Sequence, residues 1–141
     1  MKVIFADTSY WVALIDHRDQ GHDAATAISK SLANDSLLTT DEVLTEVLAF
    51  FSAFDPRMRK YVSDFVVDLL MNQSYVEVVE QTRASFLAGL ALYEGRPDKS
   101  YSLVDCISMQ LMRAEGLTEV LTSDHHFVQE GFRALLRANK P

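Results

Sequence analysis

The sequence predicts an α/β fold, with a central parallel sheet of four to five short strands and helices on both faces. Two observations support this prediction. Short apolar runs recur along the 141-residue chain, and segments with helical periodicity separate them. Strands that alternate with helices usually pair in parallel, and helices then cover both faces of the sheet. Apolar residues make up 48% of the chain, which is enough to bury a core without disulfides.

The first elements come from the N-terminal third of the chain. Residues 2–6 (KVIFA) are expected to form a short buried strand. Helices are expected over 9–17 and 22–33, because Gly21 interrupts the periodic pattern between them. The run LLTT at 37–40 is predicted as the second strand.

A helix is predicted next, from about Asp41 to Ala53. Thr39 followed three positions later by Glu42 is typical of a capping box at its start. The pair Asp55-Pro56 should end this helix and begin another over about 57–72.

The remaining elements repeat the alternation of strand and helix. YVEVVE alternates as a strand does, and the segment from Ser102 is apolar and ends at a glycine. The predicted elements are a strand at 75–80, helices at 82–93 and 102–116 and a strand at 118–122. The segment 132–136 fits a helix or a strand, and an edge strand is favoured.

Composition excludes several classes of protein. The single cysteine, Cys106, excludes an internal disulfide and a cysteine zinc cluster. No apolar run reaches the length of a membrane span, and the N-terminus lacks a signal-peptide pattern, so we expect a cytoplasmic protein with no membrane contact. The net charge of −7 argues against broad electrostatic binding of nucleic acid, although a metal bound by carboxylates can restore attraction for phosphate.

Two predicted strands are each followed by an aspartate. Asp7 follows the first strand, and Asp124 follows the strand at 118–122. The carboxyl ends of parallel strands meet at one edge of the sheet, where functional groups collect. Each aspartate taken alone fits a helix cap as well as a metal ligand, and Asp124 could cap a short turn over 125–130.

Asp105 is the only charged residue in the apolar run LVDCISMQLM. An ionised carboxylate in a buried helix requires a partner or a cation. Ser102 is a plausible N-cap, however, and Asp105 then occupies the third helical position of a capping box. From spacing alone the two roles have equal weight.

Glu46 and the histidines give weaker signals. Glu46 lies at the edge of an apolar helical stripe, and the pattern does not favour it over Asp41 or Glu42. His125 and His126 are adjacent, and adjacent histidines in a turn are not expected to face one point, so we expect a surface or supporting role rather than zinc binding.

With acidic residues in the order Asp7, Glu46, Asp105 and Asp124, the chain resembles the PIN-domain family, whose members include VapC-type toxin ribonucleases. The matching stretches are VIFADTSYWVALI, LLTTDEVLTEVL and SYSLVDCISMQLMRAEGLTEVLTSDHHF. The last stretch is the most specific, with a hydroxyl two residues before an aspartate, then a helix, a glycine, a strand and Thr-x-Asp-x-x-Phe.

The resemblance implies a single PIN-like domain over residues 1–141 that binds Mg²⁺ or Mn²⁺ and cleaves RNA phosphodiesters. Asp7 and Asp105 would be the main metal ligands, and Glu46 and Asp124 would act through water or a second ion. Such ions prefer hard oxygen ligands and retain several waters. Supporting hydroxyls would come from Thr8, Ser9, Ser102 and Thr122, and the nearest basic candidates for substrate contact are Arg96 and Lys99.

The same resemblance implies an antitoxin partner protein and a homodimer. Two alternatives stay open. One is a PIN-like interaction module without catalytic activity, in which the acidic cluster is structural. The other is a phosphatase of the haloacid-dehalogenase type, although Ser9 stands where that fold expects a second aspartate.

Overall fold

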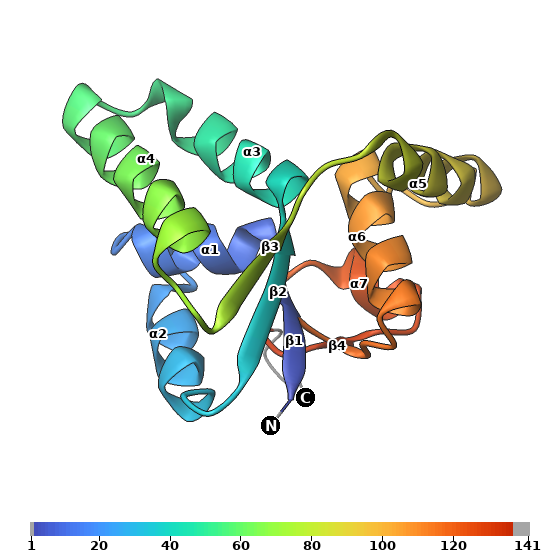
Figure 1. The fold of residues 1–141 in the computed structure, drawn as a ribbon, viewed down its shortest axis with the longest axis horizontal. Helices are drawn as coiled ribbons and strands as arrows, with labels where there is room; N and C mark the ends of the chain where they lie inside the picture. The colour runs from blue at the N-terminus through green and yellow to red at the C-terminus, as the bar shows by residue number, and fades with distance from the viewer. Residues whose placement is uncertain (1, 137–141) are drawn as a thin grey trace.

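A five-stranded parallel sheet forms the centre of the structure, a computed structural model that describes residues 2–136 (Figure 1). Its strand order is β3-β2-β1-β4-β5, and every neighbouring pair is parallel. This confirms the predicted sheet, including an edge strand near the end of the described chain. The strands are β1 (Val3–Ala6), β2 (Ser36–Thr40), β3 (Val76–Val79), β4 (Glu119–Leu121) and β5 (Arg133–Ala134).

Helices cover both faces of the sheet, as the alternating pattern predicts. In Figure 1 the sheet runs down the middle, with α1 to α4 on the left and α5 to α7 on the right. None of the helices among the described residues is both long and apolar enough to cross a membrane. The helices are α1 (Thr8–Ile15), α2 (His22–Ser31), α3 (Asp41–Phe50), α4 (Pro56–Met71), α5 (Arg83–Gly95), α6 (Leu103–Ala114) and α7 (His125–Gln129), and a 3₁₀ turn, η1 (Phe51–Ala53), follows α3.

The start of α3 differs from the expected capping box. Strand β2 continues to Thr40, so Thr40 is the N-cap and its hydroxyl accepts from the Val43 N–H. Thr39 is fully buried, and its hydroxyl instead donates to the carbonyl of Ala6 at 2.8 Å. The predicted cap at Thr39 is therefore wrong by one residue, because the strand and not the helix determines where Thr39 points. The predicted helix over 41–53 also ends early, at Phe50, where η1 begins.

The order of the strands fixes where a site can form. From β1 the chain moves to β2 and β3 on one side, and it later places β4 and β5 on the other. The carboxyl ends of β1 and β4 therefore lie side by side at a topological switch point, where ligands bind in open parallel sheets. The Asp7 N–H donates to the carbonyl of Leu121 at 3.1 Å, which joins the two strand ends directly.

Helix α6 is held close to α5 at a glycine. A Cβ built on Gly89 would lie 2.3 Å from the Cγ1 of Ile107, so only glycine allows this approach of the two helices. Ile107 is buried and follows Asp105 by two positions on α6. The α5–α6 contact therefore sets the position of the first turn of α6, which carries Asp105.

Candidate active site

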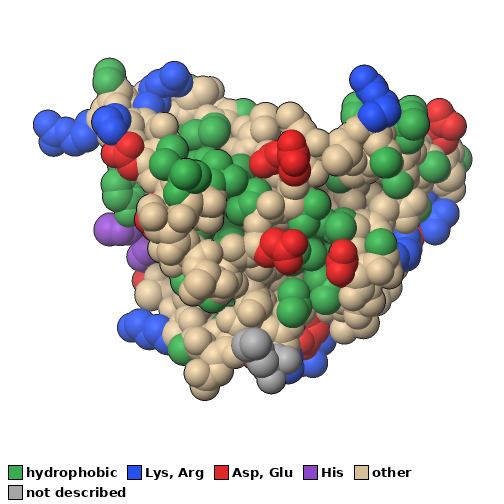
Figure 2. All heavy atoms as spheres, in the orientation of Figure 1, with side chains coloured by type: hydrophobic (Ala, Val, Ile, Leu, Met, Phe, Trp, Pro, Cys, Tyr) green, Lys and Arg blue, Asp and Glu red, His purple; other side chains and the backbone are tan. Residues whose placement is uncertain are grey.

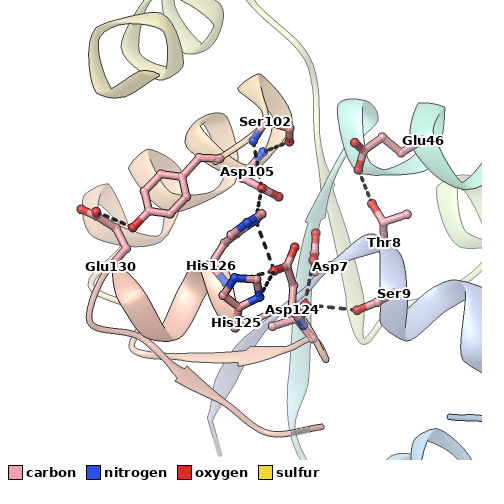
Figure 3. Close-up of polar contacts among 12 residues, drawn as sticks. Asp7, Thr8, Ser9, Glu46, Ser102, Asp105, Asp124, His125, His126 and Glu130 are labelled. Carbon is pink, nitrogen blue, oxygen red and sulfur yellow. Dashed lines mark hydrogen bonds and ion pairs between the residues drawn. The ribbon is translucent and has the colours of Figure 1, made fainter. Parts of the chain in front are cut away.

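All four predicted acidic residues line one cleft of about 900 Å³ at the carboxyl edge of the sheet (Figure 3). They come from four separate parts of the chain. Asp7 follows β1, Glu46 lies on α3, Asp105 lies in the first turn of α6, and Asp124 precedes α7. The fold therefore brings together residues that are far apart in the sequence.

Asp7 lies at the N-cap position of α1, yet its side chain makes no capping hydrogen bond. Its carboxylate instead accepts a 2.8 Å hydrogen bond from the hydroxyl of Thr122, which follows β4. The Asp7 residue is 4% exposed, so this carboxylate is almost removed from water. The cap that its position suggests is absent, and the side chain belongs to the cleft.

Asp105 combines the two roles that its spacing left open. It forms the capping box of α6, in which the Ser102 N–H donates to the Asp105 carboxylate at 3.1 Å. The Asp105 N–H in turn donates to the Ser102 hydroxyl at 3.0 Å. The same carboxylate lines the cleft. The capping bonds therefore hold a nearly buried carboxylate in a fixed orientation toward the cleft.

Glu46 is distinguished from its acidic neighbours by its contacts. The hydroxyl of Thr8 donates to the Glu46 carboxylate at 2.5 Å, and both residues line the cleft. Asp41 does not line the cleft, and its carboxylate accepts from the backbone N–H of Gln81. Helical periodicity alone does not distinguish Glu46 from Asp41, because the difference between them depends on which face of α3 contacts α1.

Asp124 caps α7, as its position after β4 suggested, by accepting from the His126 N–H at 2.9 Å. The His126 ring then reaches back into the cluster. Its Nδ1 lies 3.0 Å from the Asp105 carboxylate and 3.2 Å from the Asp124 carboxylate (Figure 3). His126 is thus a direct neighbour of two site residues, a contact that the sequence did not reveal.

The expectation that the adjacent histidines do not face one point is wrong. The ligand atoms of Asp124, His125 and His126 all lie within 4.8 Å of one another. His125 Nδ1 is 3.6 Å from the Asp124 carboxylate, although the His125 side chain is 58% exposed. These three residues are a second candidate metal group, at the rim of the same cleft.

A chain of hydroxyl contacts supports the strand ends. Thr122 is fully buried, and its hydroxyl lies 3.1 Å from the Ser9 hydroxyl and accepts from the Asp124 N–H at 3.1 Å. The Ser123 N–H donates to Ser9 at 3.1 Å. Thr122 therefore contacts Asp7, Ser9 and the backbone of Asp124 at once.

Burial, and to a smaller extent mutual repulsion, raises the pKa of three of the carboxylates. Burial, with the nearby charges of Asp105 and Glu46, raises the pKa of Asp7 to about 7, against the opposing effect of the Thr8 N–H and the Thr122 hydroxyl. Burial is also the main cause that raises the pKa of Glu46 and of Asp105, and the Asp124 charge adds to it in both cases. Without a nearby positive charge, ionising this cluster is unfavourable.

No lysine or arginine of residues 2–136 lines the cleft. On the face shown in Figure 2, lysine and arginine side chains lie toward the periphery, and acidic and hydrophobic side chains lie nearer the middle. The four carboxylates supply the oxygen ligands that Mg²⁺ and Mn²⁺ prefer, and the His126 ring lies beside two of them. The residues present therefore fit a hard divalent cation.

The two basic candidates for substrate contact do not line the cleft. Arg96 donates to the Glu130 carboxylate from Nε at 2.9 Å and from Nη2 at 3.0 Å. Lys99 Nζ lies 3.4 Å from the Asp98 carboxylate. The Arg96 guanidinium is committed to a two-bond ion pair, and its partner lies 34 residues away in the chain.

The sequence and the fold both resemble those of known proteins. The model of the PIN domain matches residues 4–132. The structure of VapC20 from Mycobacterium tuberculosis, described as a sarcin-ricin loop cleaving toxin, is 25% identical and superposes with a TM-score of 0.76, covering 92% of this chain and 95% of that one. The structure of VapBC2 from Rickettsia felis, bound to a DNA fragment from its promoter, is 15% identical with a TM-score of 0.66, covering 95% and 97%. No curated protein matches the sequence.

Proposed function

The chain belongs to the PIN-domain family, and we propose that it is a metal-dependent endoribonuclease that acts as the toxin of a toxin–antitoxin pair. The main support is the convergence of four carboxylates on one cleft that no described lysine or arginine lines. RNA as the substrate class is supported by the similarity to VapC20, the toxin described as cleaving the sarcin-ricin loop.

Asp7 and Asp105 are the proposed ligands of Mg²⁺ or Mn²⁺. Both are nearly buried, and burial raises the pKa of each, so a bound cation would favour their ionised forms. Glu46 and Asp124 are proposed to contribute through water or a second ion, since both are more exposed and line the same cleft. Such an ion, when bound, supplies an activated water and neutralises charge that develops on the phosphate.

The remaining residues are proposed to orient the carboxylates. Thr122 holds Asp7, Thr8 holds Glu46, and the capping box with Ser102 holds Asp105. Ser9 contacts Thr122 and so supports the Asp7 side of the cleft. Residues that hold metal ligands in position through hydrogen bonds commonly influence the metal affinity as well as the geometry of the site.

An antitoxin protein, a homodimer and a cytoplasmic location complete the proposal. The antitoxin is supported by the similarity in fold to VapBC2, which was crystallised with promoter DNA. The phosphatase alternative is not retained, because the PIN-domain match spans nearly the whole chain. An interaction module without activity is the remaining alternative, and a cleavage assay separates it from the nuclease.

The test is cleavage of single-stranded RNA by the intact chain, in Mg²⁺ or Mn²⁺ and in excess EDTA. We expect cleavage only with metal, and its loss in Asp7→Asn and in Asp105→Asn. Asp64→Asn is the matched control, because Asp64 is an exposed residue of α4 that pairs with Lys60 outside the cleft. Cleavage that persists in both site variants would contradict the proposal, and no cleavage of any RNA by the intact chain would favour the interaction module.

A further inference from the structure

The cleft is lined by apolar as well as polar side chains. One face of α1 contributes Thr8 and Ser9 beside the carboxylates, and one turn further along it contributes Val12 and Ala13. Phe50 also lines this cleft. A nucleotide likewise combines a charged phosphate with a base that presents an apolar face.

Phe50 lies on the same side of α3 as Glu46. It follows Glu46 by four positions on α3, and residues four apart on a helix lie on one face. The Phe50 residue is 50% exposed, although its neighbour Phe51 is 1% exposed. The Phe50 ring therefore lies in the same cleft as the acidic cluster and remains accessible.

The Phe50 ring contacts two other aromatic rings. The Phe51 ring lies 5.0 Å away at an interplanar angle of 82°, and the Phe54 ring lies 5.8 Å away at 40°. Contacts of this kind favour a defined ring orientation. Phe50 therefore presents a fixed aromatic surface to the cleft.

The charge of the cleft makes such a surface useful. Among residues 2–136, no lysine or arginine lines it, so the protein offers no direct ion pair to the RNA backbone there. Aromatic side chains can contact RNA without a charge of their own, because every base has a π face that stacks on them. Sequence-specific RNA recognition also targets unpaired bases that can stack in this way.

We propose that Phe50 stacks against an unpaired base of the RNA next to the phosphate held at the carboxylates. Phe50 is then a substrate-binding residue that selects single-stranded RNA. This inference rests on the proposed ribonuclease function for its cleavage readout, and a binding readout tests it independently.

The binding experiment uses Phe50→Trp in the Asp7→Asn chain, titrated with short single-stranded oligoadenylate. The natural sequence has one tryptophan, Trp11, which is 2% exposed, so an added exposed indole would dominate quenching. We expect oligoadenylate to quench its fluorescence and an abasic oligomer of equal length to quench little. Tyr61→Trp in the same background is the matched control, since Tyr61 is 53% exposed and does not line the cleft.

The kinetic experiment uses Phe50→Leu, which keeps an apolar contact with Phe51 and Phe54 but removes the π face. We expect kcat/KM to fall about tenfold, mostly through KM, as for the loss of one base–aromatic stack. Tyr61→Leu should leave both constants unchanged.

Three results would overturn the stacking role. The first is equal quenching of the indoles at positions 50 and 61. The second is an indole at position 50 that is already shielded from RNA by a second copy of the chain, and the third is an unchanged KM in Phe50→Leu. Failure of the proposed function is distinguishable, because the chain would then bind oligoadenylate through position 50 without cleaving RNA.

Discussion

The hydroxyl of Thr122 donates a 2.8 Å hydrogen bond to the carboxylate of Asp7, across the junction of β1 and β4. The two residues are 115 positions apart, and both are buried. This bond connects the end of one strand to the end of its neighbour at the point where the acidic cluster forms. The orientation of Asp7 therefore depends on Thr122, whose hydroxyl otherwise contacts the Ser9 hydroxyl and the backbone N–H of Asp124.

Thr122→Val should weaken metal binding without removing a ligand. The valine keeps the shape of the side chain but loses the hydroxyl, so Asp7 would be less firmly oriented. We expect affinity for Mn²⁺, measured by calorimetry, to fall roughly 10- to 100-fold. Thr122→Ser keeps the hydroxyl and should stay close to the original affinity. Equal affinities for the valine and serine variants would show that the hydroxyl does not orient Asp7.

Asp7 should make the metal-free protein less stable as pH rises. Its pKa is about 7 in the folded chain, against 3.8 for an ordinary aspartate, so between these pH values the folded state binds more protons than the unfolded state. Stability from this group is therefore complete at low pH and is lost as pH rises through 7. Asp7→Asn removes the effect.

Denaturant unfolding in EDTA at pH 5 and pH 8 measures that difference. We expect the free energy of unfolding of Asp7→Asn, relative to the original chain, to rise between these pH values by on the order of 2 kcal/mol. Saturating Mn²⁺ should remove the difference for the original chain. A constant difference between the two chains across this pH range would contradict the raised pKa of Asp7.

Gly89→Ala should disturb the contact that positions α6. The added methyl group would meet Ile107 at 2.3 Å, and backbone atoms of Ile107 lie 3.0 and 3.1 Å away, so the helices must separate. We expect a loss of about 2 kcal/mol in unfolding free energy. Gly95→Ala is the matched control at the end of the same helix, where nothing lies within 4 Å of the added group. Equal stability of the two variants would show that the close approach at Gly89 is unimportant.

Glu130→Gln should destabilise the fold while leaving the cleft intact. The Glu130 side chain is 4% exposed and pairs with Arg96 and Arg113. Burial alone would raise its pKa, but hydrogen bonds from both arginines and from Tyr101 lower it to about 2. The two arginine side chains are 39% and 40% exposed, so water screens the charges that Glu130→Gln leaves unpaired, and we expect a loss of about 1.5 kcal/mol.

The pH dependence distinguishes this role from a loss of packing. Because the folded pKa of Glu130 is lowered, its stabilisation is complete above pH 4.5 and is lost as pH falls toward 2. The deficit of Glu130→Gln should therefore shrink over that range, while Mn²⁺ affinity at pH 7 stays unchanged. Asp64→Asn, which breaks an exposed pair, should change stability by less than about 1 kcal/mol. A deficit independent of pH would contradict the ion-pair role.

The fold was largely predictable because strand and helix periods are local properties of the sequence. The apolar run before Asp7 and the run before Asp124 each form a strand, and their parallel pairing brings both carboxylates to one edge. The spacing of Ser102 and Asp105 also predicts the observed capping box. The error at Thr39 arose because two adjacent threonines fit a cap equally well, and only pairing with β1 determines which one ends the strand.

The parts of the site that were not predictable depend on contacts between distant segments. The contact of His126 with Asp105 requires the packing of α7 against α6, which no local pattern encodes. The choice of Glu46 over Asp41 depends on its contact with Thr8, 38 positions earlier. Arg96 was a candidate for substrate contact in the sequence because its ion-pair partner, Glu130, lies 34 residues along the chain.

The most direct test of the acidic cluster is the position of bound Mn²⁺ in crystals of the intact protein, located by anomalous scattering. We expect the strongest peak between the carboxylates of Asp7 and Asp105, and its loss in Asp105→Asn. A peak at Asp124, His125 and His126 alone, with none near Asp7, would contradict the assignment of the metal site.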